Sequence, residues 1–487
     1  MTLSSVLAKN TTYLTISSIA QKALAFWWFT YVAAQLGEDT LGKYTFAVTY
    51  TSIFVILMNF GLIPVLTREG AKDPTKLQEY FTSVLSIKII LTVISTVVLL
   101  GVFHGLNYFK PMPDYTVLLV YLAIGIIVFD TFRSIIFAVL RAQQMMQYEA
   151  IGQFFYQVIV VVAGLIFFRL GFKAGGLIVA INLASVLYLV YSLVILFKKT
   201  TIRLAWQWRW PTLRRLLLVA APFALADIFF KLNGSIDTVM LEYLAGDRYV
   251  AWYTIALKLT VTLTVIPGAF ATAFFPAMSQ ALTQSREALR DIFEQSTILL
   301  IVISAPIAVG TTILAPSIIH LGFAGFPAAI PALQWFMAGL IFLFVNYPIG
   351  NVLNAANRQL LNTVNMGIAL VVNIILNVLL VPQYTYLGAP AAAVGSTIAL
   401  VGLGLPHVYQ MTSFRFGLLL KKLLLAMCSA GVMGGAVWLV QSFLTMTGWL
   451  FVLTMLGAMV VYGATLIVTR TITAPEIRHV WTAIRRS

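Results

Sequence analysis

Charged side chains within long apolar segments are the residues of this sequence with the clearest chemical potential. Lys22 and Lys231 lie roughly 16 Å and 22 Å into such segments if these are helices, which rise about 1.5 Å per residue. An ammonium group that far from a membrane surface needs water or a counter-ion. We therefore predict that both lysines face a hydrated cleft.

Two acid–base pairs have helical spacing. Asp227 precedes Lys231 by four residues and Asp130 precedes Arg133 by three, so each pair lies on one face of its helix. The Asp227–Lys231 pair has two interpretations. Either it neutralises itself and lowers the cost of insertion, or its lysine faces a cleft and exchanges its partner for a substrate anion or a proton.

The intramembrane charges together make the predicted interior net positive. The cations are Lys22, Lys88, Arg133, Lys231 and Lys258, and the clear anions are Asp130, Asp227 and Asp237. Lys88 and Arg133 lie near the inner ends of their segments, so the alternative for each is an anchor whose long side chain reaches the cytoplasmic interface.

Amide side chains form stripes on other predicted helices. The candidate sugar contacts among them are Asn373, Asn377, Asn354, Gln153 and Gln157. Such amides either hold helices together through hydrogen bonds or offer paired donors and acceptors to sugar hydroxyl groups. Near Lys22, residues Thr11, Thr15 and Ser18 fall on the same helix face and extend a polar stripe that is predicted to line the cleft.

These residues belong to a chain composed almost wholly of membrane-spanning segments. Its 487 residues are 60% hydrophobic and only 10% charged, and its mean hydropathy is +0.94, whereas soluble domains carry about 25% charged residues. The single cysteine, Cys428, cannot form an intramolecular disulfide. The composition excludes a soluble enzyme, a secreted disulfide scaffold and a disordered chain, and it predicts an all-α polytopic membrane protein.

Apolar segments of sufficient length predict fourteen transmembrane helices. Their approximate limits are 11–36, 44–66, 82–104, 116–138, 151–168, 176–197, 216–242, 251–277, 296–320, 330–354, 361–381, 389–410, 423–444 and 449–469. With the N terminus inside, 21 of the 31 Lys and Arg residues lie on the cytoplasmic side and five lie outside, as the positive-inside rule requires. Both termini are therefore expected to be cytoplasmic.

An internal repeat divides the chain. YVAAQLGEDTLGKYTFAVTY at 31–50 is similar to VMLEYLAGDRYVAWYTIALK at 239–258, and each contains a helix end, a Gly/Asp turn and a helix start. Six helices per repeat give both repeats the same orientation, and two such lobes with a cleft between them are typical of alternating-access carriers. The predicted domains are an N-terminal lobe (1–200), a basic cytoplasmic linker (201–215), a C-terminal lobe (216–412), and two extra helices with a cytoplasmic tail (413–487).

The sequence lacks the common catalytic motifs. It contains no GxxxxGK(S/T), HExxH or GxSxG motif, its four histidines form no cluster with metal-ligand spacing, and no connection between spans exceeds 18 residues. We therefore expect no enzyme activity, no cofactor and no metal. Despite the formal charge of +15, we expect no nucleic-acid partner, because the basic residues follow the topology rule.

Two segments, DTVMLEYLAGDRYVAWYTIALKL (237–259) and LVPQYTYLGAPAAAVGSTIA (380–399), together with the plan of six, six and two spans, carry a family resemblance. The chain resembles the polysaccharide-transporter family of the multidrug/oligosaccharidyl-lipid/polysaccharide (MOP) flippase superfamily. The resemblance implies a flippase that moves a polyprenyl-diphosphate-linked oligosaccharide from the cytoplasmic to the outer leaflet of the cell inner membrane for cell-surface polysaccharide or glycan assembly. It also suggests a polysaccharide polymerase or glycosyltransferases as partners within the lipid bilayer.

Within this resemblance, depth and helix face assign the roles. The expected ligands of the diphosphate or of acidic sugars are Lys22, Lys231, Lys258 and Arg133, and the expected charge-balancing or coupling residues are Asp227, Asp130 and Asp237. Coupling to a Na⁺ gradient, to an H⁺ gradient or to the membrane potential stays open. One alternative is a cation-coupled multidrug exporter of the same superfamily, for which an acidic, aromatic cavity is expected. The other is a lipid II flippase, a branch that typically has an Arg-rich first lobe.

Overall fold

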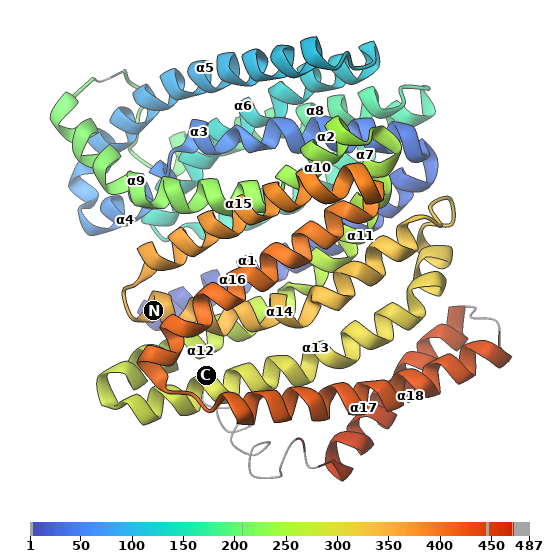
Figure 1. The fold of residues 1–487 in the computed structure, drawn as a ribbon. Coiled ribbons are helices and arrows are strands. Elements are labelled where there is room, and N and C mark those ends of the chain that lie inside the picture. The colour runs from blue at the N-terminus through green and yellow to red at the C-terminus, as the bar shows by residue number, and fades with distance from the viewer. Residues whose placement is uncertain (1–2, 207, 445–447, 470, 472–487) are drawn as a thin grey trace. The chain divides into compact units, whose positions relative to one another are not determined.

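The computed structural model of the chain is built of α-helices (Figure 1). It describes residues 3–206, 208–444, 448–469 and 471, with side chains from residue 20 onward. The chain divides into two compact units, residues 1–251 and residues 252–487. Each unit has apolar clusters of its own.

The helices of the first unit follow one another with short connections. They are α1 (Leu3–Leu36), α2 (Glu38–Ile53), α3 (Val55–Asn59), α4 (Leu62–Lys72), α5 (Leu77–Phe109), α6 (Asp114–Ala142), α7 (Met146–Arg169), α8 (Ala174–Lys199), α9 (Trp210–Asn233), α10 (Ile236–Leu244) and the start of α11 (Asp247–Leu263), with a short 3-10 helix, η1, at Pro74–Lys76. Within this unit, α6 packs against α8, α7 against α8, and α1 against α7.

The second unit begins within α11. Its further helices are α12 (Val265–Gln284), α13 (Arg286–Gly322), α14 (Ala329–Ala355), α15 (Gln359–Tyr384), α16 (Gly388–Thr412), α17 (Phe416–Phe443) and α18 (Gly448–Val468), with a 3-10 helix, η2, at Thr385–Leu387. Here α13 packs against α14 and α17, and α15 packs against α16. The backbone N–H of Arg415 donates to Glu294 Oε1 at 2.7 Å and its guanidinium binds the same carboxylate, which ties the start of α17 to α13.

Twelve segments of the described residues are long and apolar enough to cross a membrane. The prediction of an all-helical, multi-pass membrane protein is thereby confirmed. The number of fourteen spans stays a prediction. One of the twelve segments, Gln359–Thr412, contains both α15 and α16, which were expected as separate spans.

The span expected at 44–66 is not one helix. It is divided into α2, α3 and α4, which follow one path across the first unit (Figure 1). The second break is a pair of left-handed residues, Phe60 (φ 41°) and Gly61 (φ 65°). A Cβ atom on Gly61 would lie 2.5 Å from the carbonyl oxygen of Ala220 and 2.7 Å from the nitrogen of Ala224, both in α9. Glycine is therefore needed here both for its backbone conformation and for the close approach to α9.

The basic connection after α8 is bound to the first unit. Ile202 is buried in its apolar cluster. The side chain of Gln78 donates to Arg203 O at 2.9 Å and accepts from Arg203 N–H at 2.8 Å. Helix α9 begins at Trp210, and α9 and α10 make their contacts within residues 1–251. The predicted lobe boundaries stay a prediction, but packing groups the expected span 216–242 with the first unit.

Candidate functional site

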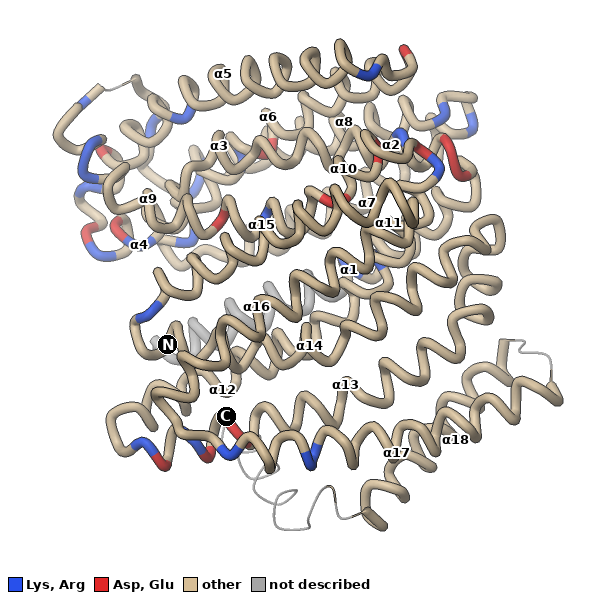
Figure 2. The backbone as a smooth tube through the Cα atoms, in the orientation of Figure 1, with Lys and Arg blue, Asp and Glu red and all other residues tan. Residues whose placement is uncertain are grey.

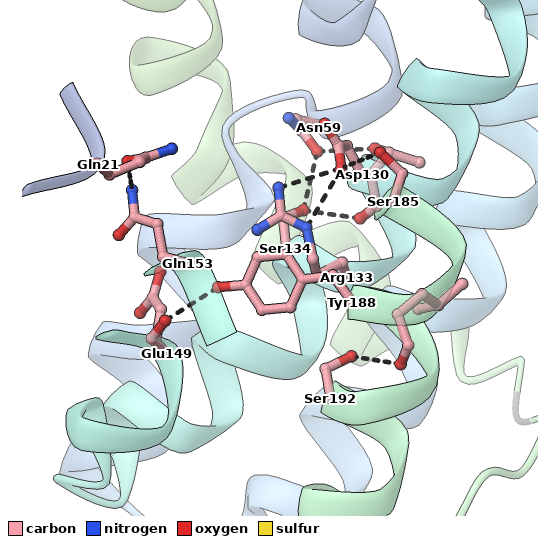
Figure 3. Close-up of polar contacts among 12 residues, drawn as sticks. Gln21, Asn59, Asp130, Arg133, Ser134, Glu149, Gln153, Ser185, Tyr188 and Ser192 are labelled. Atoms are coloured by element: carbon pink, nitrogen blue, oxygen red, sulfur yellow. Dashed lines mark hydrogen bonds and ion pairs between the residues drawn. The ribbon is translucent and has the colours of Figure 1, made fainter. Parts of the chain in front are cut away.

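A polar centre lies between α6 and α8 in the first unit (Figure 3). Arg133 forms an ion pair with Asp130, one turn earlier in α6, with Nη2 3.2 Å from Oδ1. Ser185 of α8 donates to the same carboxylate oxygen at 3.3 Å. The helical spacing predicted this pair correctly, and the structure adds the hydroxyl group that helps to hold Asp130 in place.

Aromatic rings surround the Arg133 guanidinium. Its Cζ lies 4.3 Å from the centre of the Tyr188 ring and 5.9 Å from that of Tyr156. A guanidinium over an aromatic face at such distances is stabilised by the ring's quadrupole. The side chain of Arg133 remains 21% exposed. The cation is thus oriented by a carboxylate and by aromatic rings while part of it stays accessible.

Lys88 of α5 is the residue that sequence reasoning placed least well. Its side chain is fully buried, at 0% exposure, rather than extended toward an interface. Its Nζ donates to Asn59 Oδ1 at 2.6 Å and to Ser134 Oγ at 3.3 Å. The Thr131 hydroxyl donates to Asn59 Oδ1 as well, at 3.0 Å. Lys88 forms no ion pair with any residue that the structure describes.

This lysine joins the broken span to α6. Asn59 is the last residue of α3 and directly precedes the left-handed Phe60 and Gly61. The hydrogen bond from Lys88 of α5 to Asn59 therefore holds the backbone in place at the break between α3 and α4. Asn59 and Lys88 are 29 residues apart on different helices, so no spacing rule points to their contact.

Lys22 lies on α1, and its side chain is exposed. The neighbouring Gln21 accepts a hydrogen bond from Gln153 of α7 at 2.6 Å, which fixes α1 on α7 at the level of Lys22. Gln153 was predicted either to contact sugar or to hold helices together. In the structure its hydrogen bond joins α7 to α1. The side chains of Thr11, Thr15 and Ser18 lie outside the described residues.

The charged residues of α9 and α10 differ in exposure. Asp227 is exposed and Lys231 is half-buried, both on α9, whose interior contains Pro222. Asp237, in the first turn of α10, is buried. The three residues therefore do not present one uniform polar face.

The second unit holds Lys258 and the predicted asparagine contacts. Lys258 is exposed on α11. Asn373 and Asn377 are buried in α15, where the amide of Asn377 donates to Asn373 Oδ1 at 3.1 Å and that of Asn373 donates to Ser396 Oγ of α16 at 3.5 Å. Asn354 is half-buried at the end of α14. The buried pair thus links α15 to α16, and its role as a sugar contact stays a prediction.

A cavity of about 410 Å³ in the first unit lies apart from these residues. Its wall is formed mainly by apolar side chains at one end of α6, α7 and α8, among them Tyr115, Leu118, Phe167 and Phe172. None of the predicted site residues contributes to the wall, and Gln157, another predicted contact, is buried in α7. The cavity is therefore not the candidate site.

Two known protein families match parts of the chain, and together the matches cover most of it. The family described as "Polysaccharide biosynthesis protein" matches residues 7–282. The family described as "MatE" matches residues 222–379. The two matches overlap over residues 222–282, which contain the second half of α9, α10, α11 and most of α12.

Solved structures share the fold at low sequence identity. A lipid II flippase MurJ in an inward closed conformation has a TM-score of 0.75 at 16% identity, over 94% of this chain and 98% of that chain. An inward-facing multidrug resistance MATE family transporter of the MOP superfamily has a TM-score of 0.70 at 17% identity, over 81% and 94%. A MOP superfamily transporter from Pyrococcus furiosus, described by the reverse polarity of its binding pocket, has a TM-score of 0.56 at 16% identity, over 85% and 96%.

One curated relative is similar in sequence. The uncharacterized membrane protein MJ1068 of Methanocaldococcus jannaschii is 27% identical over 164 residues. The alignment spans 33% of this chain and 32% of that protein. The chain thus matches about a third of the length of this relative.

Proposed function

The chain belongs to the Polysaccharide biosynthesis protein family, and we propose that it is a transporter of the MOP superfamily that acts as a flippase for a polyprenyl-diphosphate-linked oligosaccharide. It moves this lipid from the cytoplasmic to the outer leaflet of the cell inner membrane by alternating access. The glycan then enters cell-surface polysaccharide or glycoprotein assembly, where a polymerase or glycosyltransferases act on it.

The observation that supports the proposal is the accessibility of cations on the long helices of the first unit, although Lys231 lies in the last turn of α9 rather than deep within one helix. Figure 2 shows that charged residues gather mainly toward helix ends, with few between them. Lys22 is exposed on α1, Lys231 is half-buried on α9, and Arg133 keeps part of its guanidinium accessible. Intramembrane cations are costly, and a diphosphate is the kind of ligand that compensates for the cost.

The two carboxylates nearest these cations have a complementary role. Asp130 holds Arg133 through an ion pair. A diphosphate oxygen that approaches the accessible side of the guanidinium exchanges for this partner, because Arg binds phosphate and carboxylate through the same donors. Asp227, one turn before Lys231 in α9, is the proposed charge-balancing residue for that lysine, and Asp237 is the candidate for binding a coupling ion. Lys258, in the second unit, stays a proposed ligand of the substrate.

The apolar part of the substrate needs no enclosed site. A polyprenyl chain stays in the hydrocarbon layer while the head group crosses. Gln153 and Asn373 now join neighbouring helices, so they contact sugar only after those helices separate during the cycle. The other proposed sugar contacts are Gln157, Asn354 and Asn377.

A multidrug exporter is the second candidate, favoured by the match to the MatE family over residues 222–379. An exporter of cationic drugs needs an acidic cavity, whereas the first unit offers Lys22, Arg133 and Lys231. A lipid II flippase is chemically closer, since lipid II also carries a diphosphate. The two flippase activities differ in the glycan and are separated by experiment.

The decisive experiment is translocation by purified protein in liposomes. Fluorescent polyprenyl-diphosphate oligosaccharides, lipid II and a cationic dye are assayed separately, with and without Na⁺ and H⁺ gradients and a membrane potential. Faster movement of the oligosaccharide lipid between leaflets, without accumulation of the dye, supports the proposal. Dye transport without lipid movement would overturn it.

A further inference from the structure

Two elbows of the first unit meet at one end of the bundle. The first joins α1 to α2 at Gly37 (φ 72°), and the second joins α10 to α11 at Gly246 (φ 115°). These are the two similar segments at 31–50 and 239–258. The approach is close, because a Cβ atom on Gly42 would lie 1.8 Å from the carbonyl oxygen of Asp247. Residue 42 must therefore be glycine for the second elbow to rest on α2.

Ion pairs cross between the elbows. Lys43 of α2 lies 3.7 Å from Asp247 of α11, and Arg248 lies 3.4 Å from Glu38 and 3.3 Å from Asp39. Figure 2 shows acidic and basic segments beside each other at this end of α2. Lys110, after α5, donates to Tyr243 O at 2.7 Å. By the positive-inside rule this end of the unit faces the outside of the cell.

Two carboxylate oxygens at this contact lack hydrogen bonds. Glu242, at the end of α10, is only 5% exposed. Among the described residues, neither Glu242 Oε2 nor Asp247 Oδ1 has a hydrogen-bond partner, although both oxygens are buried. The two carboxyl groups lie within interaction range of each other. Two buried acceptors side by side are costly unless a donor joins them.

The neighbouring cations do not supply that donor. Lys43 lies nearest to the other oxygen of Asp247, Oδ2. Lys110 donates to backbone carbonyl groups, including that of Glu242 at 3.4 Å. Arg248 is engaged by Glu38 and Asp39. A single proton on Glu242 would satisfy both unpartnered oxygens at once.

We propose that Glu242 and Asp247, which both belong to the α10–α11 elbow, share a proton that keeps α10 packed on α2. Loss of the proton leaves the buried Glu242 as an anion, and α10 then moves away from α2 so that water reaches this carboxylate. Glu242 donates from its carboxylic acid, and the Asp247 carboxylate accepts. On release, the proton passes from Glu242 to water on the outer side, and two carboxylates remain that repel each other.

The helix ends decide which residue carries the proton. Glu242 lies near the C terminus of α10, where the helix dipole disfavours an anion, while Asp247 begins α11, where the dipole favours one. Glu242 also lies between the candidate spans Trp210–Asn233 and Asp247–Gln284. Burial and then the neighbouring Asp247 raise the pKa of Glu242, and Lys110 and Lys43 oppose this. Because the pKa of the closed state is raised, closure is favoured at low pH and lost as pH rises through that pKa.

The test measures the separation of the elbows against pH. Cysteines replace the exposed residues Gln35 and Leu244 in a Cys428→Ala background and carry spin labels in nanodiscs. At about pH 5.5 we expect one narrow distance distribution, and at about pH 9 a longer and broader one. Glu242→Gln keeps a donor toward Asp247 without a titrating proton, so its distribution should stay narrow at both pH values. Asp114→Asn, which removes an exposed carboxylate at the start of α6, is the matched control and should behave like the parent.

Infrared spectroscopy tests for the proton on Glu242 directly and needs no spin labels. A protonated carboxylic acid absorbs separately from a carboxylate. At about neutral pH we expect this band in the parent and in Asp114→Asn and its loss in Glu242→Gln. Either of two results would overturn the proposal: an elbow separation that is independent of pH in the parent, or the same acid band in Glu242→Gln as in the parent.

Discussion

At the scale of single residues, the proposed substrate site depends on the ammonium groups of Lys22 and Lys231. A hydrogen bond to a charged group contributes about 1.5–3 kcal/mol, so Lys22→Ala or Lys231→Ala should slow translocation of the diphosphate-linked glycan at least about tenfold. Lys→Arg at either position keeps the charge and should retain more activity. The assay is liposomal translocation at matched protein amounts.

A control for this prediction is Lys198→Ala, which removes an exposed cation at the end of α8. It should leave the rate nearly unchanged, because an exposed interfacial charge contributes little. If Lys22→Ala and Lys231→Ala both translocate at the parental rate, the basic site is assigned to the wrong residues.

Lys88 has a structural role that differs from that of the accessible lysines. Its ammonium donates to Asn59 and Ser134 in a fully buried position. Lys88→Met keeps the length but removes the donor, and we expect a loss of about 1–3 kcal/mol in stability. Asn59→Ala should cost a similar amount, and the double variant should cost less than the sum, because both changes remove one interaction. Thermal unfolding in detergent measures all three variants, and additive effects would show that the contact is not a stabilising unit.

At the scale of elements, the break between α3 and α4 is sensitive to substitution. Gly61→Ala would place a methyl group 2.5 Å from the carbonyl oxygen of Ala220 on a backbone with φ 65°. Either α4 or α9 must then shift. We expect a lower unfolding temperature, by an amount that corresponds to more than about 1 kcal/mol, and slower transport.

The matched control is another glycine in the same unit. Gly105, in α5, has open space where its Cβ would lie. Gly105→Ala should leave stability unchanged or raise it by about 0.5–1 kcal/mol, since alanine favours helix. Equal destabilisation by the two substitutions would exclude the contact with α9 as the cause.

The sequence predicts the helices and the contacts within one helix, but it does not predict contacts between residues that are far apart in the chain. The helices follow from apolar length, and the Asp130–Arg133 pair from spacing within one helix, so both were predictable. The break at Phe60 and Gly61 was not, because it depends on the approach of the α9 backbone. Lys88 with Asn59 and Gln21 with Gln153 are separated by 29 and 132 residues, and such contacts leave no periodic pattern.

At the scale of the whole molecule, the distribution of charge predicts the orientation in the membrane. Three candidate spans, α6, α7 and α8, separate Tyr108 from Leu204. An odd number of crossings puts these residues on opposite sides. The positive-inside rule predicts that the basic connection that contains Leu204 lies inside, and Tyr108 is therefore expected outside.

Cysteine accessibility tests this orientation in a Cys428→Ala background. Tyr108 is 84% exposed and Leu204 is 49% exposed, so a cysteine at either position can react with a maleimide. With a reagent that does not cross membranes, Tyr108→Cys should be labelled in intact cells and Leu204→Cys only in inverted vesicles. Prior treatment with a permeant thiol reagent should block both reactions and serves as the control. Labelling of both cysteines from the same side would contradict the three crossings, and a reversed pattern would place the substrate-loading face outside.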